Sequence, residues 1–522
     1  MTLHPLVTTL APELILVVAA SIMVVLGAGR SNGQSAPAIG LLAIAAAVLA
    51  AGRVALSEAP AGLIVDPVTG YARFIVLAVG AVILLVNRHV PAGPQRGEFF
   101  ALLLFSLAGA MLVAAADDLI LFFLALELVS IPTYILVALS RNDLRASEAG
   151  VKYFFLGSFA AASLLYGLSF LYGMTGTTTL FGNGASDANA ARLASAAAQA
   201  DPLAVVGLLL VIAGLAFKLA AVPMHFYAPD VYQGAAAPVA GLLGFVPKLA
   251  GLIGLIRVLS LVGWNLSPAL FWLLWVLAAA TMTVGNVTAL LQSNARRMLA
   301  YSSIAHSGYL LLAILAGPGD GDAAPTRNGV SAALFYIAVY GLMNLGAFAA
   351  LAFFRREADG QPIEDVEDLA GAARRHPAAS LALAICALSL MGMPPTGGFL
   401  GKVYLFSSAI ASSGQAGRGS ALLVLVVIAV VNAAIAAAYY LRLIATCYLR
   451  PAPQRDAGHT RCHALEAGLA VCAAAMLVFF VAPRLLSAPA GWAGRAVPVA
   501  ARAQNAFADP AASPRPAAQR VP

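Results

Sequence analysis

Long apolar stretches recur along the chain at nearly even intervals, and short polar segments separate them. Each stretch holds roughly 18 or more residues, the length that an α-helix needs to cross a bilayer. In lipid a segment must satisfy its own backbone polar groups, so we expect every stretch to be helical. The pattern predicts about fourteen spans, near residues 10–28, 38–56, 71–88, 98–115, 117–139, 149–174, 203–222, 235–261, 267–291, 298–316, 330–354, 379–410, 420–448 and 462–483.

The composition agrees with an all-α polytopic membrane protein. Of the 522 residues, 61% are hydrophobic and only 10% are charged, whereas a soluble domain has about 25% charged residues. No convincing cleavage site follows the first span, so we interpret it as a retained helix rather than a signal peptide. No Gly-rich phosphate loop stands between a strand and a helix, so any chemistry is expected inside the membrane.

Arginines are distributed unevenly between the two sides of the predicted bundle. If the N-terminus lies outside, the connections that face the cytoplasm carry more arginines than the connections on the outer side. Because cytoplasmic loops are enriched in positive charge, this distribution predicts that both termini lie on the outer side. The net charge of +7 comes from these scattered arginines and does not indicate a nucleic-acid partner.

Three connections and the C-terminal tail are long enough to examine. Residues 175–202 suit a solvated loop, and residues 317–329 suit a short Gly/Asp/Pro loop. Residues 355–378 mix both charge signs, which fits a short amphipathic helix at the membrane surface or a plain solvated loop. The Ala/Pro/Arg-rich tail after about residue 484 is predicted to be disordered.

The four cysteines lie in or beside apolar runs and form no C-x-x-C pair. We interpret them as small buried hydrophobic residues, and we expect no zinc, iron–sulfur cluster or disulfide. They are Cys386, Cys447, Cys462 and Cys472.

Lysine and arginine are segregated along the chain. Arginine lies almost entirely in connections or at span ends, whereas lysine occurs only four times and always inside a predicted span. A guanidinium keeps its proton at any reachable pH, but a buried ammonium can lose one, which suits proton transfer. The alternative is that each lysine extends its ammonium to the headgroups. The four lysines are Lys152, Lys218, Lys248 and Lys402.

One carboxylate and two histidines complete the set of titratable groups in apolar sequence. Glu127 stands at the centre of the span 117–139, where a charge costs a few kcal/mol. It therefore either transfers protons or pairs permanently to hold helices together. His225 and His306 fit a proton relay because neutral histidine titrates near physiological pH, although each also fits a hydrogen-bonded core residue.

Two spans are interrupted by helix-breaking residues, each beside a lysine. Irregular backbone at membrane depth is tolerated only where protein buries it or a wet cavity borders it, and paired interruptions indicate a transport site. Five spans separate the two breaks, an odd number, which predicts an inverted repeat. The first break, Pro223, follows Lys218, and the second, formed by Pro394, Pro395, Gly397 and Gly398, precedes Lys402.

The chain is therefore expected to have four parts. Residues 1–97 form three N-terminal helices, residues 98–261 a first five-helix repeat broken near 223, and residues 262–448 a second, inverted repeat broken near 394–398. Residues 449–522 form the last helix and an outer-side tail.

A mechanism follows as a hypothesis. Glu127 and Lys218 on neighbouring helices pair when both are charged, and separating them changes the proton affinity of the lysine. The proton then passes through His306 or Lys248 towards Lys402, and these groups titrate as one coupled set.

Several segments together carry a family resemblance: "LALELVSIPTYIL", "EAGVKYFFLGS", "FKLAAVPMHFYAPDVYQGAAAPV", "RRMLAYSSIAHSGY" and "GMPPTGGFLGKVYLF". Over nearly its whole length the chain resembles the antiporter-like membrane subunits of respiratory complex I, which are related to the multi-subunit Na+/H+ antiporters. Within this family it is similar to the N subunits, since M subunits usually have glutamate where Lys402 stands. The chain departs from the family near Tyr227, where tryptophan is usual, and at "AAAP", where Pro-Thr or Pro-Ser is usual.

The resemblance implies a central hydrophilic axis of Glu127, Lys218, Lys248 and Lys402. His225 and His306 are the implied helpers, and we assign an auxiliary role to Lys152 as well. The implied function is proton translocation driven by quinone reduction elsewhere in NADH:quinone oxidoreductase, so the chain is expected to be a translocase subunit.

The resemblance also implies fourteen helices and no redox centre or other cofactor in this chain. NADH, FMN, iron–sulfur clusters and quinone are expected in other subunits. The implied partners are subunit M, the small membrane subunits, lipid and protons, and the implied location is a bacterial inner membrane with both termini periplasmic.

Two alternative functions stay open. The first is a subunit of a Na+/H+ antiporter, although the sequence shows no midplane carboxylate cluster for sodium. The second is a scaffold whose buried charges only hold helices together.

Overall fold

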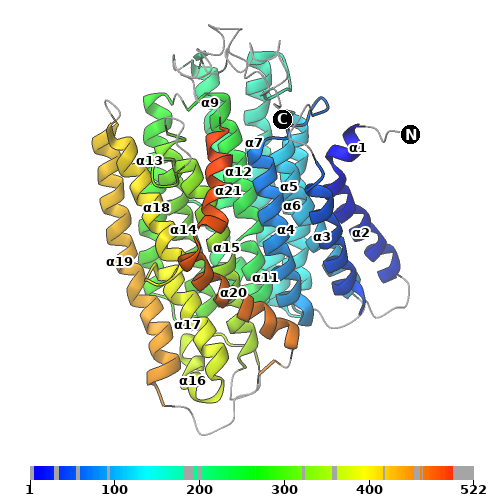
Figure 1. The fold of residues 1–522 in the computed structure, drawn as a ribbon, viewed down its shortest axis with the longest axis vertical. Coiled ribbons are helices and arrows are strands. Elements are labelled where there is room, and N and C mark those ends of the chain that lie inside the picture. The colour runs from blue at the N-terminus through cyan, green and yellow to red at the C-terminus, as the bar shows by residue number, and fades with distance from the viewer. Residues whose placement is uncertain are drawn as a thin grey trace, which may run out of the picture.

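The computed structural model is a bundle of helices that run roughly along one common direction (Figure 1). It describes residues 5–28, 34–54, 59–90, 95–181, 201–264, 266–319, 324–355, 361–414, 418–451 and 462–497, together with 193, 195–196, 199 and 459–460. Over these residues the regular secondary structure is helical, and strand-type pairing is limited to isolated bridges. The expected all-α fold class is confirmed.

The predicted spans are confirmed as helices whose ends lie within a few residues of the predicted ones. In the described part of the chain, eleven helices are long and apolar enough to cross a membrane, and three shorter ones are also apolar. The shorter ones are Ala11–Val25, Ala36–Ala51 and Pro377–Met391. The last of these continues after an interruption, so that two half-helices make up one crossing.

The helices fall into a short N-terminal group, two five-span units and a C-terminal pair. The N-terminal group is α1 (Pro5–Thr9), α2 (Ala11–Ala28), α3 (Ala36–Ala51) and α4 (Pro67–Val86), the last followed by η1 (Asn87–His89). The first unit comprises α5 (Arg96–Ala115), α6 (Leu119–Leu139), α7 (Leu144–Thr175), α9 (Pro202–Leu219), α10 (Ala228–Gly234), α11 (Ala237–Leu243) and α12 (Val246–Leu261).

The second unit comprises α13 (Pro268–Leu290), α14 (Ala295–Ala316), α15 (Gly329–Phe353), η2 (Val366–Leu369), α16 (Ala372–Arg375), α17 (Pro377–Met391), α18 (Gly397–Ala411), η3 (Ser412–Gly414) and α19 (Gly419–Leu449). The C-terminal pair is α20 (His463–Val481) and α21 (Arg484–Arg495).

The two units have similar internal packing. In the first unit α5 contacts α6, α6 contacts α7, α7 contacts α9, and α12 packs against α5, α6 and α9. In the second unit α13 contacts α14, α14 contacts α15, α15 contacts α17 and α18, and α19 packs against α13, α14 and both half-helices. The helices of the two units therefore contact one another in a similar order, and the two repeats with their boundaries stay a prediction.

Polar residues just before the apolar runs begin many of these helices. Each accepts a hydrogen bond from a backbone N–H of the first turn, which would otherwise have no intrahelical partner. The side chains that do this are Asp66, Asp118, Asp143, Asp201, Ser267, Asn294 and Asn328. Polar residues therefore set the span boundaries.

Three features differ from the predictions. The span 235–261 is interrupted at residues 244 and 245, between α11 and α12. The short helix α10 follows the first break. The prediction of disorder after residue 484 is wrong for Arg484–Arg495, because α21 packs against α4 and α15 and buries Leu486, Ala490 and Ala493. Residues 498–522 lie outside the described residues.

The described parts of the long connections contain little regular secondary structure. Residues 366–369 and 372–375 form single helical turns rather than one continuous amphipathic helix. Much of the predicted loop 175–202 lies outside the described residues, but its beginning packs on the bundle, since the Phe181 N–H donates to Asp117 Oδ1 at 2.7 Å. In Figure 1 the first described helix and the end of α21 both reach the upper end of the bundle, so the ends of the described chain lie on one side.

Candidate functional site

The first interruption frees backbone carbonyls that side chains then satisfy. Helix α9 ends at Leu219, and Ala220 adopts a left-handed conformation with φ of 54°. The Tyr227 hydroxyl donates to the Phe217 carbonyl at 2.9 Å, and the Ser307 hydroxyl donates to the Leu219 carbonyl at 2.5 Å. Irregular backbone at membrane depth is thus buried in protein, as the bilayer requires.

Glu127 and Lys218 form an ion pair beside this break. The Lys218 ammonium lies 3.5 Å from Glu127 Oε1 and also donates to the Ser130 hydroxyl. Glu127 and Ser130 are three residues apart on α6, so they share one face of the helix. The lysine side chain is 4% exposed and the carboxylate 18% exposed, which places the pair in a largely water-free setting.

Lys248 lies on α12, within one turn of the interruption between α11 and α12, and is 1% exposed. Its ammonium donates to the Ser307 hydroxyl at 2.8 Å and to the Ser303 carbonyl, and it faces the Tyr340 ring at 5.7 Å. Ser307 is the residue whose hydroxyl reaches the end of α9. One serine therefore connects Lys248 to the half-helix that carries Lys218.

His306 is buried on α14, next to Ser307 and three residues after Ser303, the two serines that contact Lys248. Its Nδ1 lies 2.5 Å from the Tyr336 hydroxyl and its Nε2 lies 3.2 Å from the Tyr440 hydroxyl. Both ring nitrogens are therefore engaged by groups that can donate or accept a proton. The Tyr340 hydroxyl donates to Ser303 Oγ at 2.8 Å, which connects the same aromatic cluster to the surroundings of Lys248.

Lys402 lies at the second interruption and is bound by backbone. Helix α17 ends at Met391, and the Lys402 ammonium donates to the carbonyls of Leu390 at 3.0 Å and Met391 at 2.7 Å. The last carbonyls of a helix lack intrahelical partners and carry its partial negative charge, so they stabilise a cation. The ammonium also faces the Tyr309 ring at 5.1 Å, and no carboxylate pairs with it in the described part of the chain.

Each of the two interruptions has a lysine beside it, although one lysine precedes its break in the sequence and the other follows its break. Lys218 is in the last turn of α9, the half-helix that precedes its break, whereas Lys402 is on the half-helix that follows its break. Lys218 is itself part of the last turn of one preceding half-helix, and the Lys402 ammonium contacts the last carbonyls of the other. Each break contains one cis peptide bond before proline, at Pro223 and at Pro395.

Close backbone approach accounts for the glycines after the second break. The residues that begin α18, Gly397 and Gly398, are buried. The Gly398 N–H donates to Ser389 Oγ at 3.1 Å, and a Cβ at position 398 would lie 2.0 Å from the Ser389 carbonyl oxygen. Only glycine permits the two half-helices to approach this closely, and the approach holds Lys402 against the end of α17.

Two of the residues selected from the sequence do not join the buried network. The Lys152 side chain is 44% exposed and pairs with Glu148 at 2.8 Å and with Asp230 at 3.0 Å. Asp230 also contacts Arg297 at 2.6 Å, so Lys152 belongs to a cluster of charges at the end of the bundle. His225 is partly exposed, and its Nδ1 lies 3.3 Å from the Pro223 carbonyl within the break itself.

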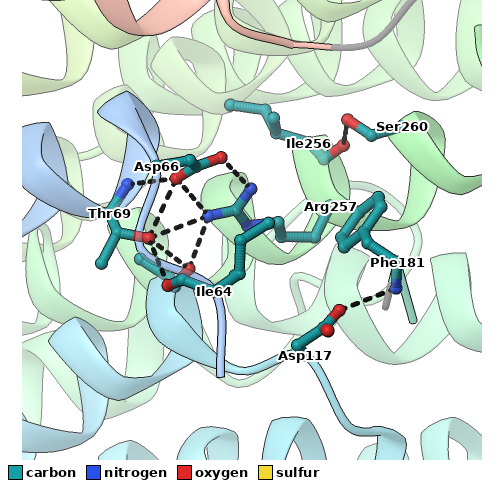
Figure 2. A network of polar contacts seen from close by, with 9 residues as sticks. Ile64, Asp66, Thr69, Asp117, Phe181, Ile256, Arg257 and Ser260 are labelled. Carbon is teal, nitrogen blue, oxygen red and sulfur yellow. Dashed lines mark hydrogen bonds and ion pairs between the residues drawn. The ribbon is translucent and has the colours of Figure 1, made fainter. Parts of the chain in front are cut away.

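Sequence reasoning missed two buried ion pairs that involve arginine. Arg73 contacts Glu13 at 2.7 Å between α4 and α2. Arg257 contacts both oxygens of Asp66, at 2.6 and 2.8 Å, and donates to Thr69 and to the Ala114 carbonyl (Figure 2). The signal was present, because Glu13, Arg73 and Arg257 all fall inside predicted spans.

The arrangement as a whole is a row of proton-binding groups with hydroxyls between them. Glu127 and Lys218 contact each other, Ser307 connects the Lys218 half-helix to Lys248, and tyrosine hydroxyls surround His306. The Tyr336 ring also packs against α18, since a Cβ at position 401, next to Lys402, would lie 2.6 Å from a ring carbon. The network crosses from the first unit into the second through α14.

Comparisons with known proteins show which proteins this chain is similar to. A family model described as "NADH:quinone oxidoreductase/Mrp antiporter, TM" matches residues 116–435. NADH-quinone oxidoreductase subunit N 1 of Solibacter usitatus is 37% identical over 482 residues, which cover 90% of this chain and 94% of that protein. A chain of respiratory complex I from Thermus thermophilus superposes with a TM-score of 0.73 at 32% identity, covering 91% of this chain and 98% of that one. A chain of the Mrp complex from Dietzia, at 20% identity and a TM-score of 0.76, shares the fold.

Proposed function

Because this chain belongs to the NADH:quinone oxidoreductase/Mrp antiporter family, among the N subunits of NADH-quinone oxidoreductase, we propose that it translocates protons across the membrane as part of that enzyme. Protons move along the buried row from Glu127 and Lys218, past Lys248 and His306, to Lys402. The energy comes from quinone reduction in other subunits.

The observation that carries this proposal is the ion pair between Glu127 and Lys218 at the end of a broken helix. Two unit charges 3.5 Å apart attract each other by about 5 kcal/mol at an effective dielectric constant of about 20. Opening the pair therefore changes the free energy of holding a proton on the lysine by a comparable amount. A conformational change that opens and closes the pair can move a proton onward.

The three buried lysines differ in the kind of group that stabilises each ammonium. Lys218 depends on a carboxylate and Lys402 on the end of a helix, whereas Lys248 depends on a serine hydroxyl and a serine carbonyl. Among the described residues no carboxylate contacts Lys248, and neither the end of a helix nor a countercharge compensates its ammonium. This setting suits a transient carrier between two resting positions.

The assembly and the location in the membrane are part of the proposal. We propose that the chain lies in a bacterial inner membrane, that both termini face the periplasm, and that subunit M and the small membrane subunits are neighbours. Arginines at the other end of the bundle support this orientation. The NADH, FMN, iron–sulfur and quinone sites are proposed to lie in other subunits.

The test uses the whole enzyme in proteoliposomes, with proton uptake and NADH oxidation measured together. Lys218→Arg keeps a cation that cannot release its proton, and Glu127→Gln removes the partner charge. Both variants are expected to lower the number of protons moved per NADH. A normal ratio in either variant would show that the altered residue has no transfer role.

A scaffold gives a different result in the same assay. If the buried charges only hold helices together, Lys218→Arg preserves the pair and pumping stays normal, whereas Lys218→Met lowers the yield of assembled enzyme. Measuring assembly beside pumping therefore separates the two functions.

A further inference from the structure

A cavity of about 200 Å³ opens among the ends of α4, α6, α11, α14 and α15. It is separate from the buried row of lysines and lies at the arginine-rich end of the bundle. The polar side chains that line it are His89, Ser140, Arg141, Arg296 and Arg355.

Three nitrogen atoms around this cavity are buried without a hydrogen-bond partner among the described residues. They are His89 Nδ1, Arg141 Nη1 and Arg296 Nε. The Arg296 side chain is 2% exposed, and its other nitrogens already reach the Ala235 carbonyl at 2.9 Å and Glu364 at 3.5 Å. The two arginine nitrogens are donors, whereas His89 Nδ1 donates in only one tautomer of the ring. A buried donor without an acceptor costs about 1–3 kcal/mol, so two unpaired guanidinium donors at one cavity indicate that an acceptor belongs there.

The charges around the cavity favour an anionic acceptor. Arg141, Arg296 and Arg355 bring three guanidinium groups to its wall. Two carboxylates lie near them: Asp143, which contacts Arg141 at 2.6 Å, and Glu364, which Arg296 shares with Arg145. Positive charge remains in excess, and several guanidinium donors converging on one space match the geometry of a phosphate group.

We propose that this arginine cavity is a binding site for a phosphate group, which ties together the ends of α4, α6 and α14. The headgroup of an anionic membrane lipid and free inorganic phosphate both carry this chemistry. The site lies where spanning helices end, which is the depth of lipid headgroups, and basic pockets between spanning helices suit such headgroups.

The experiment uses the complete enzyme in phosphate-free maltoside micelles. Inorganic phosphate and a short-chain phosphatidylglycerol are titrated separately, and the thermal midpoint of this subunit is followed at constant ionic strength. A ligand that binds only the folded state raises the midpoint as its concentration exceeds the dissociation constant. The test variant is Arg141→Gln/Arg355→Gln, and the control is Arg374→Gln, an exposed arginine on α16 that does not line the cavity.

We expect phosphatidylglycerol to raise the midpoint in the unaltered enzyme and in the control. In the double variant the apparent affinity should fall about tenfold or more, because each lost guanidinium removes a charge-assisted hydrogen bond. If inorganic phosphate gives the same variant-dependent shift, the site takes phosphate from solution. If only the lipid does so, the ligand is the headgroup. An unchanged midpoint with both ligands, or equal shifts in test and control variants, would overturn the proposal.

Native mass spectrometry of the unaltered enzyme provides a second measurement if the double variant does not assemble. After phosphatidylglycerol is added and the excess removed, one lipid is expected to remain bound per copy of this chain. Arg355→Lys, which keeps the charge but loses the planar fork, is expected to reduce this occupancy. Complete absence of retained phosphate-bearing ligand would contradict the site.

Discussion

Gly392→Ala tests whether the end of α17 holds Lys402 in place. Gly392 caps α17 with φ of 85°, and a Cβ added there would lie 2.7 Å from Lys402 Cδ and 3.3 Å from its Nζ. The obstructed atoms belong to a flexible side chain, so the lysine moves rather than the helix. The change therefore displaces the ammonium and leaves every titratable group in the chain.

The size of the effect follows from the contacts that are lost. The ammonium donates to two carbonyls, at 3.0 and 2.7 Å, and a hydrogen bond to a charged group contributes about 1.5–3 kcal/mol. Losing one of them, about 2 kcal/mol, lowers the occupancy of the docked position roughly 30-fold. The left-handed backbone adds about 1–2 kcal/mol of strain, which acts on stability rather than on the lysine.

Gly176→Ala is the matched control for that strain. Gly176 caps α7 with φ of 72°, and nothing lies within 4 Å of the position that a Cβ would take. Both variants therefore incur a similar backbone cost, but only one displaces a lysine.

The assay measures proton uptake and NADH oxidation together in proteoliposomes of the whole enzyme. Gly392→Ala is expected to lower the ratio of protons to NADH, whereas Gly176→Ala should leave the ratio normal with at most a slightly lower thermal midpoint. Equal ratios in the two variants would refute the idea that the helix end positions Lys402.

Three further outcomes are expected. Asp66→Asn leaves the guanidinium of Arg257 buried without its partner and should cost about 3–5 kcal/mol of stability, while adding Arg257→Met should recover much of it; thermal unfolding of the single and double variants measures this difference. Burial alone would raise the pKa of Asp66, but the charge and hydrogen bonds of Arg257 outweigh it and hold that pKa below its usual value, so the pair should contribute fully at neutral pH and lose its contribution only as pH falls below about 4. Lys152→Ala should change pumping little and stability by less than about 1 kcal/mol, because its ion pairs are exposed; a pumping defect would return Lys152 to the transfer path. Ser307→Ala should slow proton uptake severalfold by disconnecting Lys248 from the end of α9, and normal uptake kinetics would show that this hydroxyl is not part of the route.

Most of the fold could be predicted from the sequence because a segment that crosses a bilayer can adopt few backbone conformations. An apolar run of sufficient length must be helical, so the spans could be read directly. The breaks at Pro223 and at Pro394 to Gly398 were visible as residues that cannot continue a helix. The interruption at residues 244 and 245 was not predicted, although Pro247 in the first turn of α12 is a residue that favours the start of a helix over its interior.

The site was harder to predict because its contacts join distant parts of the chain. Glu127, Lys218, Lys248 and Lys402 were identified by their cost in an apolar setting, but the sequence does not show which groups they meet. The tyrosines around His306 lie in apolar spans and look like ordinary core residues in the sequence. Only the packing of the helices turns their hydroxyls toward the imidazole. Lys152 was expected near the start of the span 149–174. Helix α7 begins earlier, at Leu144, and the Lys152 side chain is 44% exposed there, beside Glu148 and Asp230.

The way in which Lys402 is bound has a consequence for genetics. When a lysine is paired with a carboxylate, a mutation of the lysine can be compensated by a second mutation that exchanges the two charges. Backbone carbonyls are the same in every residue, so no single substitution can replace them in this way. Second-site revertants of a damaged Lys402 region should therefore arise among residues that shape the last turn of α17, and searches confined to acidic side chains would overlook them.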